Sequence, residues 1–268
     1  MVDTELIKFK GVKKRFGKKE VLDSIDLDIP ENKITCIVGA SGEGKTTILK
    51  LLIGFYKPTK GEVTYLRKNV FKEFRRIERD FGFASGDGSF YKKLTVRENL
   101  SYFGRLHHLK KKEIEKRIKG LVDFVGLSDA LDTLAENLSI GMKKRLEIAC
   151  SIIHAPKILI MDEPTSNLDP LLRKNILDLV KGIRDRGTTI IMTTQILNEV
   201  EEICDELAIL VDKNIVEEGK VSKIKDKYGK ENLNDLFEEI FSKEKKRDKN
   251  KSKKSKGKGN KKKRDKDA

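Results

Sequence analysis

The chain has 268 residues, of which 38% are charged and 37% hydrophobic, and its formal net charge is +15. The charge is uneven, because residues 243–268 carry 15 Lys or Arg and 4 Asp or Glu, a net +11 that leaves +4 for residues 1–242. These values exclude a uniformly basic nucleic-acid-binding domain and fit a globular body with a basic tail. No stretch approaches the roughly 20 apolar residues of a membrane span, and the first residues do not resemble a signal peptide, so we expect a cytoplasmic protein.

The first third of the chain is rich in strand and turn patterns. Short apolar or alternating runs predict strands at 6–9, 25–29, 34–38 and 62–65, separated by turns that contain Pro, Gly or Asn. Apolar residues then recur with helical spacing from Lys45 to Phe55. A helix should therefore follow the strand at 34–38 across a glycine-rich loop.

The middle third is predicted to be helical, and the last third returns to strands alternating with helices. Helices are expected from Thr95 to Leu106 and at 112–125, 140–153 and 171–186, and strands at 158–161, 189–193 and 207–211. This order favours a largely parallel α/β sheet with a helical insertion. We expect a core at 1–86 and 155–222, a helical subdomain at 87–154, a C-terminal helical extension at 223–242, and a disordered Lys-rich tail at 243–268.

The loop after the predicted strand at 34–38 matches the pattern G-x-x-x-x-G-K-[ST]. Its residues are Gly39, Ala40, Ser41, Gly42, Glu43, Gly44, Lys45, Thr46 and Thr47. Glycines permit a tight concavity in which backbone N–H groups surround a phosphate, and the following helix adds its positive N-terminal end. Lys45 is expected to meet the outer phosphates, and Thr46 to bring a hydroxyl to Mg²⁺. The flanking strand and helix disfavour the alternative of a chance glycine-rich turn.

Two adjacent carboxylates follow the predicted strand at 158–161. Asp162 is expected at the metal, and Glu163 is expected where it could polarise an attacking water. By itself, an Asp-Glu pair at this place is more often an acidic turn at the end of a strand. In combination with the phosphate loop, the pair predicts a site of nucleotide hydrolysis.

The three histidines and three cysteines are not expected to form a site. His107 and His108 lie at a Lys-rich helix end and should be solvated, and all three histidines precede the strand that carries the two carboxylates. The cysteines are too few and too far apart for a disulfide framework or a zinc cluster, and should be buried small residues: Cys36, Cys150 and Cys204.

The chain resembles the nucleotide-binding subunit of ATP-binding cassette (ABC) transporters over roughly residues 4–222. The resemblance is carried by the phosphate loop and by three further segments, LTVRENL at 94–100, LSIGM at 138–142 and MDEPTSNLDP at 161–170. It implies a P-loop NTPase core, with a RecA-like mixed sheet and flanking helices, an N-terminal antiparallel β part and the helical insertion. It also implies hydrolysis of ATP with Mg²⁺, in a head-to-tail dimer that holds each ATP between one phosphate loop and the other subunit's signature motif.

Further residues take roles from this resemblance. Phe16 lies where the family stacks an aromatic ring on adenine, and the alternative is an ordinary core phenylalanine. Ser139 and Gly141 belong to the signature motif, and Ser139 also suits a helix N-cap. Asp169 matches the carboxylate that crosses the dimer interface beside the catalytic centre.

Three positions depart from the family pattern. Gly86 stands where the family has a glutamine that touches Mg²⁺ and the attacking water, Ile140 replaces the first signature glycine, and Gln195 replaces the switch histidine. Gln195 can hydrogen-bond the γ-phosphate but cannot carry charge, and loss of such a positioned group typically costs about 10²–10³ in rate. Because Glu163 is retained, we predict slow rather than abolished hydrolysis.

The partners follow from the same resemblance. It implies an integral membrane transporter subunit and a second cassette, identical or different, which places the protein peripherally on the inner face of the cell membrane. Two alternatives stay open: a regulatory, catalytically impaired cassette, or a soluble ABC ATPase acting on ribosomes or nucleic acid. The tail could remain solvated or bind anionic lipid or RNA, although no aromatic residue supports base stacking.

Overall fold

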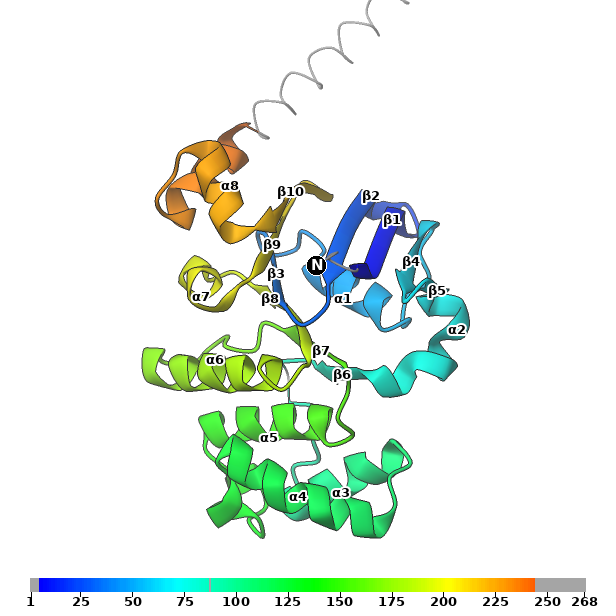
Figure 1. Ribbon diagram of the computed structural model, residues 1–268, viewed down its shortest axis with the longest axis vertical. Helices are drawn as coiled ribbons and strands as arrows, with labels where there is room; N and C mark the ends of the chain where they lie inside the picture. Colours follow the sequence, from blue (N-terminus) through cyan, green and yellow to red (C-terminus); the bar gives the residue numbers. More distant parts are fainter. Residues whose placement is uncertain (1–4, 87, 244–268) are drawn as a thin grey trace, which may run out of the picture. The chain divides into compact units, whose positions relative to one another are not determined.

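The computed structural model describes residues 5–86 and 88–243, and divides the chain into one unit that ends at Val221 and another that begins at Ser222. The first unit contains an antiparallel sheet of four strands in the order β2-β1-β4-β5 (Figure 1). These strands are β1 (Glu5–Phe16), β2 (Lys19–Pro30), β4 (Lys60–Tyr65) and β5 (Lys68–Asn69). Along β2, Ile25, Leu27 and Ile29 are buried while the residues between them are more exposed, so one face of this sheet packs inward.

The second sheet has six strands in the order β10-β9-β3-β8-β7-β6. They are β3 (Ile34–Val38), β6 (Phe81–Ala84), β7 (Ile158–Asp162), β8 (Thr189–Thr194), β9 (Glu206–Val211) and β10 (Asn214–Lys220). All neighbouring pairs are parallel except β9 and β10. Strands β3, β7 and β8 are buried almost throughout and consist of apolar residues and threonines, apart from Asp162 at the end of β7. Because these strands are parallel, their carboxyl ends meet at one edge of the sheet.

The helices of the two units are α1 (Lys45–Leu52), α2 (Val70–Ile77), α3 (Val96–Leu106), α4 (Lys111–Val125), α5 (Ile140–Ile152), α6 (Pro170–Arg184), α7 (Leu197–Ile203) and α8 (Val221–Tyr228). Within the first unit, α3, α4 and α5 form a separate group beside the six-stranded sheet (Figure 1). Helices α3, α4 and α5 pack on one another, and α5 also contacts β6. None of the helices in the described ranges is long and apolar enough to cross a membrane.

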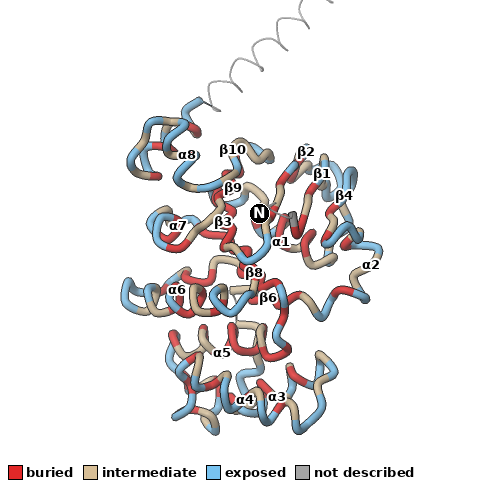
Figure 2. Tube along the Cα trace, in the orientation of Figure 1, coloured by how far each residue is buried: buried red, intermediate tan, exposed pale blue. Residues whose placement is uncertain are grey.

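An apolar core joins the two sheets and includes α1. It joins Ile48, Leu49 and Leu52 of α1 to buried side chains of both sheets, among them Phe9 and Ile160. Buried residues are concentrated in the central strands and along α5 (Figure 2). The loop between β3 and α1 is therefore anchored at both ends by packed elements.

Several elements differ from the sequence-based expectation. The antiparallel strands β1 and β2 extend over 12 residues each, and α2, β6, α7 and β10 were not predicted. Cys36 and Cys150 are buried as expected, whereas Cys204 is half-buried. In the second unit, residues 233–243 are helical and bury Leu233, Leu236 and Ile240. The tail predicted at 243–268 lies outside the described residues, except for Lys243.

Candidate functional site

Glycines shape the loop between β3 and α1. Gly44, the N-cap of α1, has φ 112°, and Gly42 has φ 83°, conformations that glycine adopts without a Cβ penalty. Gly39 is required by packing, because a Cβ there would lie 2.5 Å from the carbonyl oxygen of Leu210. The loop and the first turn of α1 line a cleft of about 320 Å³, here called the phosphate-loop cleft, which Glu163 also lines.

Most of the predicted loop residues line this cleft, and Glu43 does not. Its lining includes Ser41, Gly42, Gly44, Lys45, Thr46 and Thr47. Glu43 is directed elsewhere, since its Oε2 accepts a hydrogen bond of 3.4 Å from the backbone N–H of Lys213 in the turn between β9 and β10. The free N–H groups of a first helical turn bind anions, so the arrangement suits a phosphate.

The Lys45 side chain lies within the loop and is only 5% exposed. Its Nζ donates to the carbonyl oxygens of Gly39 at 2.8 Å and Ala40 at 3.0 Å. Burial lowers the pKa of the Lys45 ammonium, while the carboxylate of Glu163, 3.7 Å away, acts in the opposite direction. Lys45 thus places one compact cation at the edge of the cleft.

Asp162 ends β7 and accepts hydrogen bonds from two hydroxyl groups. Thr46 Oγ1 donates to Asp162 Oδ2 at 2.7 Å, and Thr193 Oγ1, from β8, donates to Oδ1 at 2.5 Å. Hydroxyl and carboxylate oxygens are ligands that Mg²⁺ accepts, so Thr46 and Asp162 fit this ion. No group of three or more His, Cys, Asp or Glu side chains within the described ranges could hold a metal alone. Phosphate oxygens would therefore have to complete the coordination.

Glu163 follows Asp162 with φ 46°, in the left-handed region that non-glycine residues seldom occupy. Its backbone N–H donates to the carbonyl and hydroxyl oxygens of Thr193, at 3.2 and 3.0 Å. Gln195 Nε2 donates to Glu163 Oε1 at 2.7 Å. Because these contacts hold an unfavourable backbone conformation, the Glu163 carboxylate is fixed beside the phosphate-loop cleft.

The sequence and the fold have close counterparts among known proteins. The family model for the ABC transporter matches residues 22–166, more than half of the chain. The chain belongs to the ABC transporter family. The lantibiotic transport ATP-binding protein of Streptococcus pyogenes is 32% identical over 242 residues, which cover 90% of this chain and 100% of that protein. A Nod factor export ATP-binding protein of Rhizobium sp. (strain N33) is 36% identical over 204 residues, 76% of this chain and 67% of that protein.

Solved structures of the same family have the same fold as this chain. The structure of an ATP-binding subunit of an ABC transporter has a TM-score of 0.79 and 25% identity, and the match covers 88% of this chain and 99% of that one. The expected fold class, an α/β P-loop core with a mixed sheet, an antiparallel N-terminal sheet and a helical insertion, is therefore confirmed. The chain spans about two thirds of the length of several longer relatives.

The segment that the sequence predicts as the signature motif leads into α5. Ser139 is the N-cap, and its Oγ accepts a hydrogen bond of 3.2 Å from the backbone N–H of Met142. Gly141 is buried against α6, where a Cβ would lie 2.8 Å from the Leu172 side chain. Of the described residues at this motif, Ile140 reaches the cleft beside Asp162 and Glu163, whereas Ser139 and Gly141 do not line it.

Asp169 and Phe16 lie at the ends of their elements. Asp169 is the N-cap of α6 and accepts hydrogen bonds of 2.9 and 3.0 Å from the backbone N–H groups of its first turn. Phe16 ends β1 opposite Lys19, which lines the phosphate-loop cleft. The Phe16 ring is 41% exposed, lies 5.0 Å from the Tyr56 ring and 4.6 Å from Lys14 Nζ. Phe16 is therefore not an ordinary core phenylalanine.

The loop at Gly86 cannot carry the glutamine that the family pattern places there. Gly86 has φ 84°, and a Cβ would lie 2.5 Å from the carbonyl oxygen of Asp162. Ser85 and Ser89 join the two sides of the loop through a hydrogen bond of 2.8 Å between their hydroxyls. A side chain at position 86 would strain the backbone at its positive φ and would require Gly86 or the end of β7 to shift.

Asp162 and Glu163 also line a second cleft of about 760 Å³, here called the carboxylate cleft. Its other wall comes from α5 and includes Lys144 and Glu147, and Gly86 lies between the two walls. Sequence reasoning missed these two α5 residues, and it missed Thr193. A signal existed for Thr193, because it pairs with Asp162 where β7 and β8 end.

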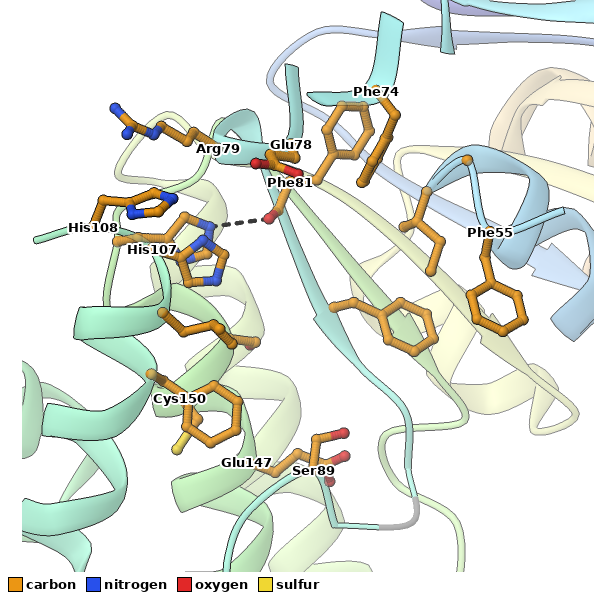
Figure 3. A pocket seen from close by; sticks show the side chains of 17 residues that line it. Phe55, Phe74, Glu78, Arg79, Phe81, Ser89, His107, His108, Glu147 and Cys150 are labelled. Atoms are coloured by element: carbon orange, nitrogen blue, oxygen red, sulfur yellow. Dashed lines mark hydrogen bonds between the residues drawn. The ribbon is translucent and has the colours of Figure 1, made fainter. Parts of the chain in front are cut away.

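A third cleft of about 620 Å³, the aromatic cleft, lies between the core and α3 to α5 (Figure 3). Phe55, Phe74 and Phe81 come from the core, while His107 and Cys150 come from the helical part. The apolar lining includes the exposed side chains of Phe55 and Leu106. Such an opening between two parts of a cassette is a surface that a partner could cover.

His107 and His154 form a stacked pair beside this cleft, with ring centroids 3.5 Å apart. The ring nitrogen Nε2 of His154 hydrogen-bonds the carbonyl oxygen of Phe81 at 3.0 Å. Burial lowers the pKa of His107, and burial together with His107 lowers the pKa of His154 to about 4. The expectation that His107 is solvated is wrong, because the end of α3 packs against α5, whereas His108 is exposed.

Proposed function

We propose that the protein is the ATP-hydrolysing subunit of an ABC exporter, and that it drives a separate integral membrane subunit. The observation that carries the proposal is the convergence of Lys45, Thr46, Asp162 and Glu163 at the carboxyl ends of β3 and β7. The names of relatives, lantibiotic transport and Nod factor export, support outward transport.

The phosphate loop binds the triphosphate through its backbone N–H groups and Lys45. Phe16, whose side chain is partly exposed, offers an aromatic ring for adenine. Thr46 and Asp162 hold Mg²⁺, which neutralises part of the phosphate charge when bound. Ser41 and Thr47, which line the same cleft, add polar groups around the phosphates.

Glu163 acts as the general base. It accepts a proton from the attacking water while the oxygen–phosphorus bond forms and the bond from the γ-phosphorus to ADP breaks. Gln195 orients the carboxylate through its bond to Oε1. Because Gln195 brings no charge to the γ-phosphate and Gly86 no side chain, hydrolysis is slow, as in a regulatory cassette.

The site is completed by a second cassette. Ser139 and Gly141 lie away from the chain's own phosphate loop cleft, and Asp169 is exposed at the start of α6. A head-to-tail partner, identical or different, would place its signature motif over this chain's ATP. In this proposal residues 1–86 and 155–222 bind ATP, and residues 87–154 carry the signature motif to the partner.

The membrane subunit covers the aromatic cleft, where Phe55 is 67% and Leu106 58% exposed. The Lys-rich tail, nearly all of it outside the described residues, adds attraction to anionic lipid on the inner face, at about 1 kcal/mol for each basic residue near the surface. RNA is the other polyanion that this tail could bind, and it would compete with anionic vesicles for the tail in a sedimentation assay.

The proposal is tested by replacing Lys45 and measuring ATP binding by calorimetry. We expect Lys45→Ala to lose most of the affinity for Mg-ATP, because the triphosphate loses its buried cation. Lys50→Ala is the matched control, since Lys50 is the other lysine of α1 and lies near the Phe55 and Tyr56 rings. Unchanged affinity in the Lys45 variant would show that nucleotide binds elsewhere or not at all.

A further inference from the structure

We propose that Lys144 and Glu147 are positioning residues for hydrolysis, which hold the loop at Gly86 where the family glutamine is missing; this inference rests on the proposed function. Glu147 Oε1 accepts a hydrogen bond of 2.9 Å from the backbone N–H of Gly86. Lys144 Nζ donates at 2.9 Å to the carbonyl oxygen of the same residue. The two side chains also pair with each other at 3.1 Å. We call this arrangement the Gly86 bracket.

The burial of the Gly86 bracket sets it apart from the other ion pairs of the helical part. The side chains of Lys144 and Glu147 are 10% and 2% exposed, whereas those of Arg117 and Glu113 in α4 are 31% and 43% exposed. Burying two charges costs desolvation free energy, and a well-packed apolar pair is often at least as stable. Stability alone therefore does not account for this buried ion pair. Its two hydrogen bonds to the backbone of Gly86 point instead to a role in positioning the loop.

That backbone unit adjoins the catalytic carboxylates. Gly86 packs against the carbonyl oxygen of Asp162, and both residues line the carboxylate cleft with Glu163. A side chain at position 86 would strain the loop there, and glycine itself brings no side chain to the site. The Gly86 bracket instead fixes the loop from α5, and this sets how closely the loop backbone approaches the end of β7.

Glu147 connects this loop to two other parts of the protein. It lines the aromatic cleft as well as the carboxylate cleft, and Figure 3 shows it beside Ser89 at one end of the aromatic cleft. It also lies on the helix that begins with Ile140 and is capped by Ser139. A displacement of α5, started at either the signature motif or the aromatic cleft, is thus passed to Gly86 through two hydrogen bonds.

The test compares two neutral double variants with the wild type. Lys144→Met with Glu147→Leu removes both bonds to Gly86 and leaves no unpaired charge. Lys144→Met with Glu147→Gln is the matched control, because it is equally neutral but keeps an oxygen for the Gly86 N–H. Three quantities are measured in the full chain: steady-state ATP hydrolysis, ATP affinity by calorimetry, and hydrogen exchange of the Gly86 amide by NMR.

We expect the Leu variant to lose about tenfold in kcat and to exchange the Gly86 amide about tenfold faster, while ATP affinity changes less than about twofold. The Gln variant should keep slow exchange and most of kcat. Equal losses of kcat in both variants, unchanged kcat in the Leu variant, or a parallel loss of ATP affinity would each overturn the inference. Failure of the proposed function would look different, as absent ATP binding in all three proteins.

Discussion

At the scale of single residues, the backbone conformation and the packing of Gly86 both favour glycine at this position. Its positive φ and its contact with the Asp162 carbonyl oxygen both oppose a side chain. We expect Gly86→Ala to lower the free energy of unfolding by about 1–3 kcal/mol. Gly120 is the matched control, since it lies in the middle of α4 and an added Cβ would meet nothing within 4 Å. Gly120→Ala should raise stability by up to about 1 kcal/mol.

Urea unfolding of both alanine variants checks this prediction. A Gly86→Ala protein as stable as the wild type would mean that the loop has another accessible conformation. In that case a glutamine at position 86 could also be accommodated. The expected instability instead means that adding the family glutamine here cannot by itself restore fast hydrolysis.

Gln195 offers the cleaner way to raise turnover. Its amide donates to Glu163 Oε1, and a histidine could keep a donor there while adding charge near the γ-phosphate. We expect Gln195→His to raise kcat by about tenfold with little change in KM, because the added charge acts mainly in the transition state. Gln195→Ala, which removes the donor, should lower kcat. Brisk wild-type hydrolysis with no gain from histidine would contradict the slow-site proposal.

At the scale of elements, the junction of β6, α3 and α5 is predicted to make stability depend on pH. The pKa of His154 is lowered to about 4 in the folded chain by burial and by His107, with Arg117 as a smaller cause, while the bond to Phe81 opposes the shift. The unfolded histidine titrates near its ordinary value of about 6.5. Between these two pH values the unfolded state binds more protons, so stability is full above about pH 6.5 and falls as the pH drops toward 4.

The loss associated with His154 should reach up to about 3 kcal/mol by pH 4, reduced where water penetrates the site. Unfolding measured from pH 7.5 to 4.5 checks the sign and the slope. His154→Gln should flatten this dependence, while His108→Gln should leave it, because His108 is exposed. An equal slope in the wild type and the His154 variant would show that other groups cause it.

Helices with a regular repeat of apolar residues and strands that are fully buried were predictable from the sequence. Helices and strands that bury few residues were not. The limits of α4 and α5 were predicted to within a residue, because apolar positions recur along each helix. Strand β10 escaped prediction because its residues are intermediate or exposed, and α2 because its eight residues bury only Val70 and Ile77. The carboxylates and the phosphate loop follow from motifs, but the Gly86 bracket joins positions about 60 residues apart through tertiary packing that no local pattern encodes.

At the scale of the whole molecule, the residues proposed for catalysis and those proposed for the signature motif lie in different parts of the chain. Glu163 lines the phosphate-loop cleft, while Ser139 caps α5 and Asp169 caps α6. A single chain therefore presents one ATP-binding half and one signature half. In the proposed function a second cassette completes the site, and this proposal predicts that ATP controls the association.

We expect Glu163→Gln protein to form a dimer with ATP and Mg²⁺, because ATP stays bound between the subunits when the general base is absent. Ser139→Asp in the same background is the control that separates the two roles of Ser139. Aspartate is a good N-cap, so α5 and the melting temperature should be preserved, but its charge repels the partner's phosphates and dimerisation should be lost. Size-exclusion chromatography with light scattering gives the mass in each case. If the Glu163→Gln protein stays monomeric with ATP and Mg²⁺, both alone and when mixed with a candidate partner cassette, the head-to-tail arrangement is wrong for this chain.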